Sequence, residues 1–234
     1  MKKLIIASTS TVHGSSYLAY ILPQLEEFFK DTKEVLFIPY ARPGGISHDA
    51  YTEIARKGFT AIGKSVSGIH TFDDPAEALR NAKAVFTGGG NTFLLVTQLY
   101  KNGIMEVLRD AVLGGVLYFG TSAGANITGL TMQTTNDMPI IYPPSFKTLG
   151  LVPFNINPHY LDPSEGSKHM GETRETRIRE FHRINTQPVV GLREGSWLEV
   201  TGDTITLRGD LTARIFEQDK DPYEIGTNSN LRIS

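Results

Sequence analysis

One serine lies in a sequence pattern that is typical of catalytic nucleophiles. The apolar run 116–119 leads directly into Gly120-Thr121-Ser122-Ala123-Gly124, a G-x-S-x-G sequence that small residues follow. A strand that turns sharply into a helix at such a pattern holds the serine Oγ at the carboxyl edge of a sheet. We expect both glycines to be needed because so tight a turn leaves no room for side chains there. Ser122 is therefore the predicted nucleophile, and the N–H of Ala123 would point toward the developing oxyanion.

A serine hydroxyl needs a general base, and histidine is the natural residue for that role near neutral pH. His159 follows the segment 154–157 and Pro158, which places its imidazole at the end of a predicted strand. His169 and His182 lie in polar surroundings, where we expect solvated side chains. The pattern leaves open which carboxylate would orient His159: Asp137, Asp162 and Glu194 all qualify.

Two glycine patterns suggest anion sites, but only one has suitable neighbours. Residues 58–65 (GFTAIGKS) match the G-x-x-x-x-G-K-[ST] pattern of nucleotide-binding loops. Such a loop needs a strand before it and a helix after it. Here helical periodicity comes first and a strand-like run follows, so we interpret this segment as the end of a helix. Residues 87–92 (TGGGNT) do lie between a predicted strand and a predicted helix, where the turn is either purely structural or binds an oxyanion.

The first 120 residues alternate between short apolar runs and amphipathic stretches. Runs rich in β-branched and aromatic residues predict strands at 4–7, 35–41, 66–72, 84–87 and 116–119. Helical periodicity covers 51–62 and 92–113, and the second stretch is interrupted near Asn102-Gly103. Strands that are apolar throughout, rather than alternating, indicate a parallel sheet covered by helices on both faces.

The second half of the chain is less regular. Prolines are frequent between 139 and 163, and a helix is predicted over about 172–183. Strands are predicted at 189–192, 196–200 and 204–207, with a tight turn at Gly202-Asp203, which indicates an antiparallel extension. Because no change in composition marks a linker, we expect residues 1–234 to form one domain.

The composition excludes several classes of protein. The 234 residues carry a net charge of −2 and no long run of like charge, so we expect neither nucleic acid nor a membrane as a partner. No segment is apolar over the length of a membrane span, and we expect a cytoplasmic protein. The chain has no cysteine, which removes disulfides and thiol nucleophiles, and no histidine pair has zinc-site spacing. We therefore expect no metal and no cofactor.

Six short segments occur in the order found in one peptidase family. They are 88–93 (GGGNTF), 120–126 (GTSAGAN), 134–139 (TTNDMP), 156–159 (INPH), 171–175 (GETRE) and 191–195 (GLREG). Through these segments the sequence resembles the peptidase E family, the α-aspartyl dipeptidases, over about residues 1 to 216. The resemblance implies an α/β fold, a three-layer sandwich around a mostly parallel sheet of the class I glutamine amidotransferase-like type. It also implies hydrolysis of dipeptides with an N-terminal aspartate, Asp-Xaa, by a serine peptidase.

The resemblance further implies roles for individual residues. The implied catalytic residues are Ser122 as nucleophile, His159 as base, Glu194 as the orienting acid, and Gly90 and Ala123 as N–H donors to the oxyanion. The implied substrate-binding residues are Arg174 for the aspartyl β-carboxylate, Asp137 near the α-amine, and Asn91. That fold usually carries a cysteine where Ser122 stands, so the chain resembles the serine branch of it. The substrate would be a small peptide, bound by a monomer or a small homo-oligomer.

Two other functions remain consistent with these residues. One is a cyanophycinase-like serine hydrolase that cuts aspartyl backbones carrying arginine, and the other is a non-catalytic binding protein that kept the turn for structural reasons. Two segments fit the family less well. The loop 160–170 differs from the family in length and composition, and 217–234 matches no family segment.

Overall fold

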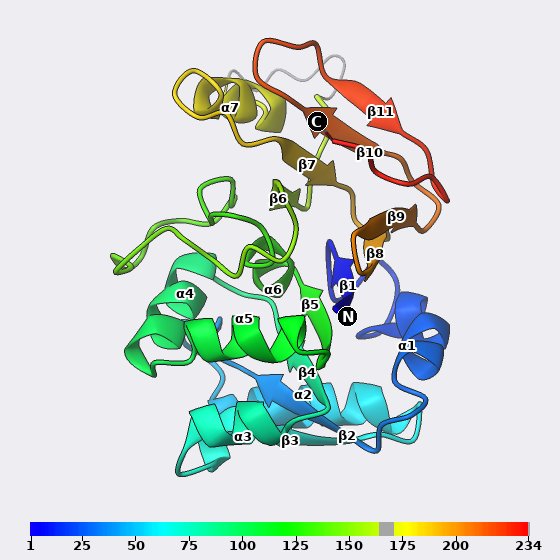
Figure 1. Ribbon diagram of the computed structural model, residues 1–234, viewed down its shortest axis with the longest axis vertical. Coiled ribbons are helices and arrows are strands. Elements are labelled where there is room, and N and C mark those ends of the chain that lie inside the picture. Colours follow the sequence, from blue (N-terminus) through cyan, green and yellow to red (C-terminus); the bar gives the residue numbers. More distant parts are fainter. Residues whose placement is uncertain (164–170, 234) are drawn as a thin grey trace.

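A seven-stranded sheet forms the centre of the computed structural model, which describes residues 1–163 and 171–233 (Figure 1). Its strands are β1 (Lys3–Ala7), β2 (Glu34–Ile38), β3 (Ser65–Gly68), β4 (Ala84–Thr87), β5 (Leu117–Thr121), β8 (Trp197–Thr201) and β9 (Thr204–Arg208). They lie in the order β3-β2-β4-β5-β1-β8-β9, and the first five run parallel while β8 and β9 are antiparallel. The predicted mostly parallel sheet with a C-terminal antiparallel extension is therefore confirmed.

Helices cover both faces of this sheet. The covering helices are α1 (Leu22–Phe28), α2 (His48–Thr60), α3 (Pro75–Asn81), α4 (Thr92–Lys101) and α5 (Met105–Leu113), with two short 3₁₀ turns, η1 (Ala19–Ile21) and η2 (Ile69–Thr71). On one face, α1 and α2 bury Leu25 and Phe59 in a cluster with Phe86 of β4. On the other face, α3, α4 and α5 contribute apolar side chains such as Leu95 and Leu108 to a larger cluster. This is the predicted three-layer arrangement, and it follows from strands that are buried on both sides.

A second, four-stranded sheet lies at the upper end of the molecule in Figure 1. Its strands are β6 (Asn155–Pro158), β7 (Val189–Leu192), β10 (Ala213–Phe216) and β11 (Tyr223–Ile225), in the order β11-β10-β7-β6, and α7 (Arg174–Phe181) accompanies them. The predicted strand 189–192 is present as β7, but it lies in this second sheet and not beside β8: it pairs in parallel with β6 and antiparallel with β10. Strand β11 lies in the segment 217–234, for which no element was predicted.

The two sheets share apolar packing. Ile156 of β6 and Val190 of β7 belong to the same buried cluster as Leu4 of β1 and Leu198 of β8. A continuous core of this kind is typical of one folding unit. We therefore propose that residues 1–234 form a single domain.

Element boundaries differ from the predicted ones where the backbone loses a partner. β2 ends at Ile38 rather than at 41 because Pro39 has no N–H to donate to a neighbouring strand. β3 stops at Gly68, and the chain then turns into η2 instead of remaining extended to 72. The interruption between α4 and α5 is confirmed, with Gly103 at a φ of 65°.

The nucleotide-loop pattern at 58–65 is the end of a helix, as predicted. Gly58 and Phe59 lie inside α2, and β3 begins at Ser65. The Nζ of Lys64 donates a hydrogen bond of 2.7 Å to the carbonyl of Thr32. Lys64 therefore binds the loop before β2. The segment has a helix before it and a strand after it, which is the reverse of the order in a nucleotide-binding loop.

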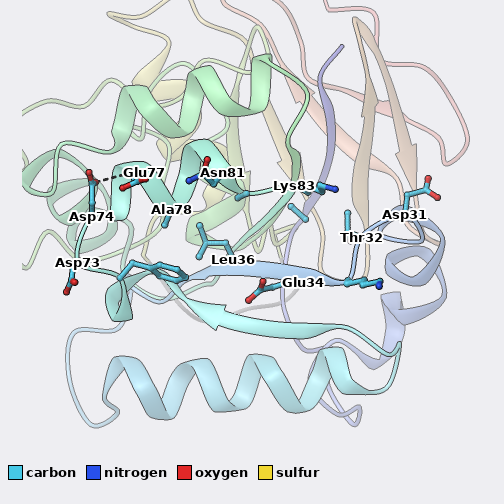
Figure 2. A pocket seen from close by; sticks show the side chains of 14 residues that line it. Asp31, Thr32, Glu34, Leu36, Asp73, Asp74, Glu77, Ala78, Asn81 and Lys83 are labelled. Carbon is cyan, nitrogen blue, oxygen red and sulfur yellow. Dashed lines mark hydrogen bonds between the residues drawn. The ribbon is translucent and has the colours of Figure 1, made fainter.

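A cavity of about 760 Å³ lies between α3 and β2 (Figure 2). Its lining includes Glu34 and Ala84, the first residues of β2 and β4. Ser122, in contrast, follows the last residue of β5, at the opposite edge of the parallel strands. The cavity is thus separate from the predicted nucleophile.

Within residues 1–163 and 171–233, every helix is too short or too polar to cross a bilayer.

Candidate active site

Ser122 occupies a strained turn between β5 and a short helix, α6 (Ala123–Asn126). Its backbone has φ 54° and ψ −111°, a conformation that residues with side chains seldom adopt. A Cβ on Gly120 would lie 2.3 Å from the carbonyl oxygen of Gly124, and one on Gly124 would lie 2.2 Å from that of Thr87. Both glycines are therefore required by close backbone contacts, which confirms the steric reason given for the pattern.

Three side chains from separate elements form a hydrogen-bonded chain at this turn. The Nε2 of His159 lies 2.8 Å from the Oγ of Ser122, and its Nδ1 lies 2.6 Å from the Oε1 of Glu194. His159 follows β6, and Glu194 lies in the loop between β7 and β8. With Nδ1–H donated to a carboxylate, Nε2 is left to accept the serine proton. The structure thus brings together Ser122, His159 and, of the three carboxylates that the pattern left open, Glu194, the one that the resemblance implied.

The other two carboxylates that the sequence left open have different partners. Asp162 forms two hydrogen bonds with the guanidinium of Arg193, at 2.7 and 2.8 Å. Asp137 accepts hydrogen bonds from the N–H and the hydroxyl of Thr92, at 2.7 and 2.6 Å. Neither side chain contacts His159 within the part of the chain that the structure describes.

The position of His159 depends on residues that sequence reasoning missed. The Oγ of Ser8, directly after β1, accepts from the N–H of His159 at 2.8 Å and donates to the carbonyl of Leu192 at 2.7 Å. His159 itself has a φ of 53°. The side-chain amide of Asn136 donates to the carbonyl of Pro158, one residue before the histidine. Serine and asparagine are common in loops, so no pattern distinguished these two, although Asn136 lies in the segment 134–139.

The glycine turn after β4 lies directly against Ser122. A Cβ on Gly89 would be 2.9 Å from the Cβ of Ser122, and Gly90 has a φ of 144°, a value that favours glycine. Among the described residues, the N–H of Gly90 donates to no backbone carbonyl. Ala123 is the first residue of α6, so its N–H has no acceptor within that helix. These are two N–H groups of the kind that an oxyanion hole needs.

Arg174, the predicted reader of the aspartyl carboxylate, is the first residue of α7. Within the described part of the chain it forms no hydrogen bond and no ion pair, and it is only partly exposed. Burial lowers the pKa of Arg174, the charge of Arg177 lowers it further, and the carboxylate of Asp137 opposes both effects. Arg174 therefore lies near Asp137, and its hydrogen-bond donors are available to a ligand.

Asn91 and Asp137 both cap the N-terminus of α4. The Oδ1 of Asn91 accepts from the N–H of Leu94 at 3.1 Å, and its Nδ2 donates to the carbonyl of Met138 at 2.8 Å. The Oδ2 of Asp137 is taken by Thr92, while its Oδ1 has no hydrogen bond among the described residues. Both side chains therefore make hydrogen bonds within the protein: Asn91 uses both ends of its amide, and Asp137 uses one of its two carboxylate oxygens.

Charged side chains beside this site connect the loop after β7 with β11, and β10 with α7. Arg193, next to Glu194, donates to Glu224 of β11 at 2.9 Å, and Arg214 of β10 pairs with Glu175, next to Arg174. Burial acts to raise the pKa of Glu224, but hydrogen bonds from Arg193 and other donors outweigh it and lower the pKa to about 2. Glu224, in the segment 217–234, therefore helps to fix Arg193, which precedes Glu194, and through Arg214 it is linked to Glu175, which follows Arg174.

Two other histidines, His169 and His182, were predicted to have solvated side chains. His182 was predicted to be solvated, but it is buried, and its Nε2 lies 3.0 Å from the carbonyl oxygen of Gln187. The prediction was wrong because α7 packs its C-terminal end against the loop before β7. His169 and most of the loop 160–170 lie outside the described residues. Among the described residues, no group of three or more histidine or acidic side chains is placed to hold a metal ion.

Comparisons with known proteins identify the family. The family model described as Peptidase family S51 matches residues 4–208, and the chain belongs to this family, as the peptidase E resemblance predicted. Peptidase E of Streptomyces coelicolor is 49% identical over 228 residues, covering 97% of this chain and 93% of its own. The probable alpha-aspartyl dipeptidase of Drosophila melanogaster is 46% identical over 233 residues, covering 98% and 96%.

Solved structures show the same fold at lower identity. A putative peptidase E protein from Listeria monocytogenes matches with a TM-score of 0.68 and 24% identity, covering 89% of this chain and 98% of that one. A peptidase from an acI-B1 actinobacterium matches with a TM-score of 0.75 and 15% identity, covering 100% and 97%. Both likenesses agree with the three-layer α/β architecture described above.

Proposed function

We propose that this peptidase is a serine exopeptidase that hydrolyses dipeptides with an N-terminal aspartate. The observation that carries the proposal is the pair of hydrogen bonds that joins Ser122 to His159 and His159 to Glu194. The printed name of the Drosophila relative, an alpha-aspartyl dipeptidase, supports the substrate class. The enzyme would act on small peptides in the cytoplasm.

The proposed chemistry is an acyl transfer through Ser122. The Oγ attacks the carbonyl carbon of the scissile peptide bond as His159 Nε2 takes the hydroxyl proton. Glu194 stabilises the imidazolium that results, and the N–H groups of Gly90 and Ala123 stabilise the oxyanion. When the intermediate collapses, the C–N bond breaks, His159 returns the proton to the leaving amine, and an aspartyl ester of Ser122 remains. Water, activated by the same histidine, then hydrolyses this ester and restores the serine.

Selectivity for aspartate would come from Arg174. A planar guanidinium binds a carboxylate through two parallel hydrogen bonds, and the guanidinium of Arg174 donates to no described residue. The Oδ1 of Asp137 accepts no hydrogen bond from a described residue, and a carboxylate oxygen suits a substrate ammonium group. Asn91 would contribute by holding the turn between Gly90 and α4, since both ends of its amide are already bonded. An apolar first residue would leave the arginine unpaired in the complex, which disfavours such substrates.

A comparison of two substrates tests this function. We expect the purified enzyme to hydrolyse Asp-Leu and to leave the isopeptide β-Asp-Arg largely intact, because in the isopeptide the free amine lies on the carbon next to the free carboxylate and not on the carbon next to the scissile carbonyl. Product formation is followed by amine detection. Turnover of β-Asp-Arg alone would favour the cyanophycinase-like alternative, and turnover of neither substrate by correctly folded protein would favour a binding protein.

Replacement of the proposed orienting acid separates it from its neighbours. We expect Glu194→Gln to lower kcat/KM on Asp-Leu by about 10²- to 10⁴-fold, because a neutral amide cannot stabilise the imidazolium. The matched control is Asp162→Asn, which removes a carboxylate bound to Arg193 and should change kcat/KM by less than about threefold. Equal losses in the two variants, measured by initial rates, would contradict the assignment of Glu194.

A further inference from the structure

A second arginine without a carboxylate partner lies near the glycine turn that borders Ser122. Arg42 is exposed, and within the described part of the chain it forms no ion pair. Its guanidinium lies over the ring of Tyr51, with Cζ 4.7 Å from the ring centroid. The stacking and a hydrogen bond to the Tyr51 hydroxyl hold this guanidinium in place, and because a guanidinium has five N–H donors, others remain for a ligand.

The residues that hold Arg42 also hold the turn at the nucleophile. The carbonyl of Ala41, the residue before Arg42, accepts from the N–H of Asn91 at 2.7 Å, and a Cβ on Gly90 would lie only 2.3 Å from that oxygen. The hydroxyl of Tyr51 donates to the carbonyl of Gly89 at 2.9 Å. Gly89 packs against Ser122. Arg42 is therefore connected to the reaction centre in two ways: through Ala41, which contacts Gly90 and Asn91, and through Tyr51, which binds Gly89.

Arg42 and Arg174 are associated with elements on opposite faces of the large sheet. Tyr51, under Arg42, belongs to α2 and to the apolar cluster that α1 and α2 form. Arg174 lies near Asp137, which caps α4, and α4 packs on the other face. A ligand that lies across the end of β5 at Ser122 would therefore have one guanidinium toward each face of the sheet, neither of them in an ion pair with a described residue.

An Asp-Xaa dipeptide has a carboxylate on each side of its scissile bond. The aspartyl β-carboxylate precedes the bond, and the C-terminal α-carboxylate of Xaa follows it. We propose that Arg42 binds the C-terminal carboxylate of the dipeptide and so restricts the enzyme to dipeptides. This inference rests on the proposed function, in which Arg174 binds the aspartyl carboxylate. A peptide that continues beyond Xaa, or ends in an amide, lacks the second charge at that position.

The test compares one variant on two substrates that differ only in that charge. We expect Arg42→Gln to lower kcat/KM on Asp-Leu about 10- to 100-fold, mainly through KM, as for the loss of one charge-assisted hydrogen bond. On Asp-Leu amide the same variant should stay within about threefold of the wild type. Arg42→Lys should recover part of the activity on Asp-Leu, because it keeps the charge.

Controls distinguish this inference from its alternatives. Lys57→Gln removes an exposed positive charge near the other end of α2 and should leave both substrates unaffected. An equal loss on Asp-Leu and on its amide would overturn the inference, because it would mean that Arg42 only supports the glycine turn. No loss on either substrate would also overturn it. If the wild type hydrolyses neither substrate, the proposed function itself fails, and that result is separate from any effect of Arg42.

Discussion

Replacement of Ser122 by alanine is expected to lower kcat on Asp-Leu by at least about 10⁴-fold. The change removes the only atom that we propose to bond covalently with the substrate, and the glycine turn around it stays as it is. We expect the substitution to leave core packing unchanged, because the Oγ of Ser122 lies in the partly exposed site, where it contacts His159. Initial rates at saturating substrate, with circular dichroism to confirm folding, measure this effect.

The same experiment with two substitutions tests whether Ser122 and His159 act together. We expect Ser122→Ala, His159→Ala and the double variant to have nearly the same residual activity, because members of a triad act as a unit. Losses that multiply would show that the two residues contribute independently. Ser122→Ala protein with wild-type activity would contradict the nucleophile assignment altogether.

Replacement of Arg174 by methionine is expected to lower kcat/KM on Asp-Leu by about 10²- to 10⁴-fold while the protein remains folded. In the complex, the aspartyl carboxylate would be left in a partly buried site without its partner. The free enzyme should tolerate the change, because Arg174 has no hydrogen bond or ion pair in the described part of the chain and its pKa is already lowered by burial.

The matched control for Arg174 lies one turn further along α7. Arg177 is more exposed and pairs only loosely with Glu172, at 3.7 Å, so Arg177→Gln should change kcat/KM by less than about threefold. Unchanged kinetics in the Arg174 variant, or equal losses in both variants, would remove Arg174 from the substrate site. Rates on Asp-Leu, together with thermal denaturation of each variant, separate binding from stability.

The nucleophile turn could be predicted from the sequence because its cause is local. Gly120 and Gly124 are needed by contacts within the strand-turn-helix unit and with the adjacent β4, so the pattern itself carries the geometry. The parallel strands were equally evident, since burial on both faces makes them apolar throughout. His159 could be selected because Pro158 ends its strand.

The rest of the site depends on contacts between distant segments. Asp162 and Glu194 are equally plausible in the sequence, and only the position of Arg193 decides that Asp162 pairs with it. Ser8 precedes His159 by 151 residues, and nothing near it indicates that it holds the histidine backbone. Strand β11 is short and largely exposed, so it has no apolar pattern, and it is fixed by the charges around Glu224.

The absence of cysteine has a sharper meaning with the structure in view. The strained turn after β5 carries Ser122, with His159 at hydrogen-bond distance. The 234 residues contain no cysteine that could replace it. This agrees with the proposal that the reaction proceeds through the Ser122 hydroxyl, with His159 as its base.

The most direct test of the central claim compares Asp-Leu with Asn-Leu on the wild-type enzyme. The two dipeptides have the same shape and differ in the charge that Arg174 would bind. We predict that kcat/KM is at least about 10²-fold higher for Asp-Leu, because the amide cannot form the charged pair with the guanidinium. Equal rates on the two dipeptides, or faster hydrolysis of Asn-Leu, would contradict the assignment of this protein as an aspartyl dipeptidase.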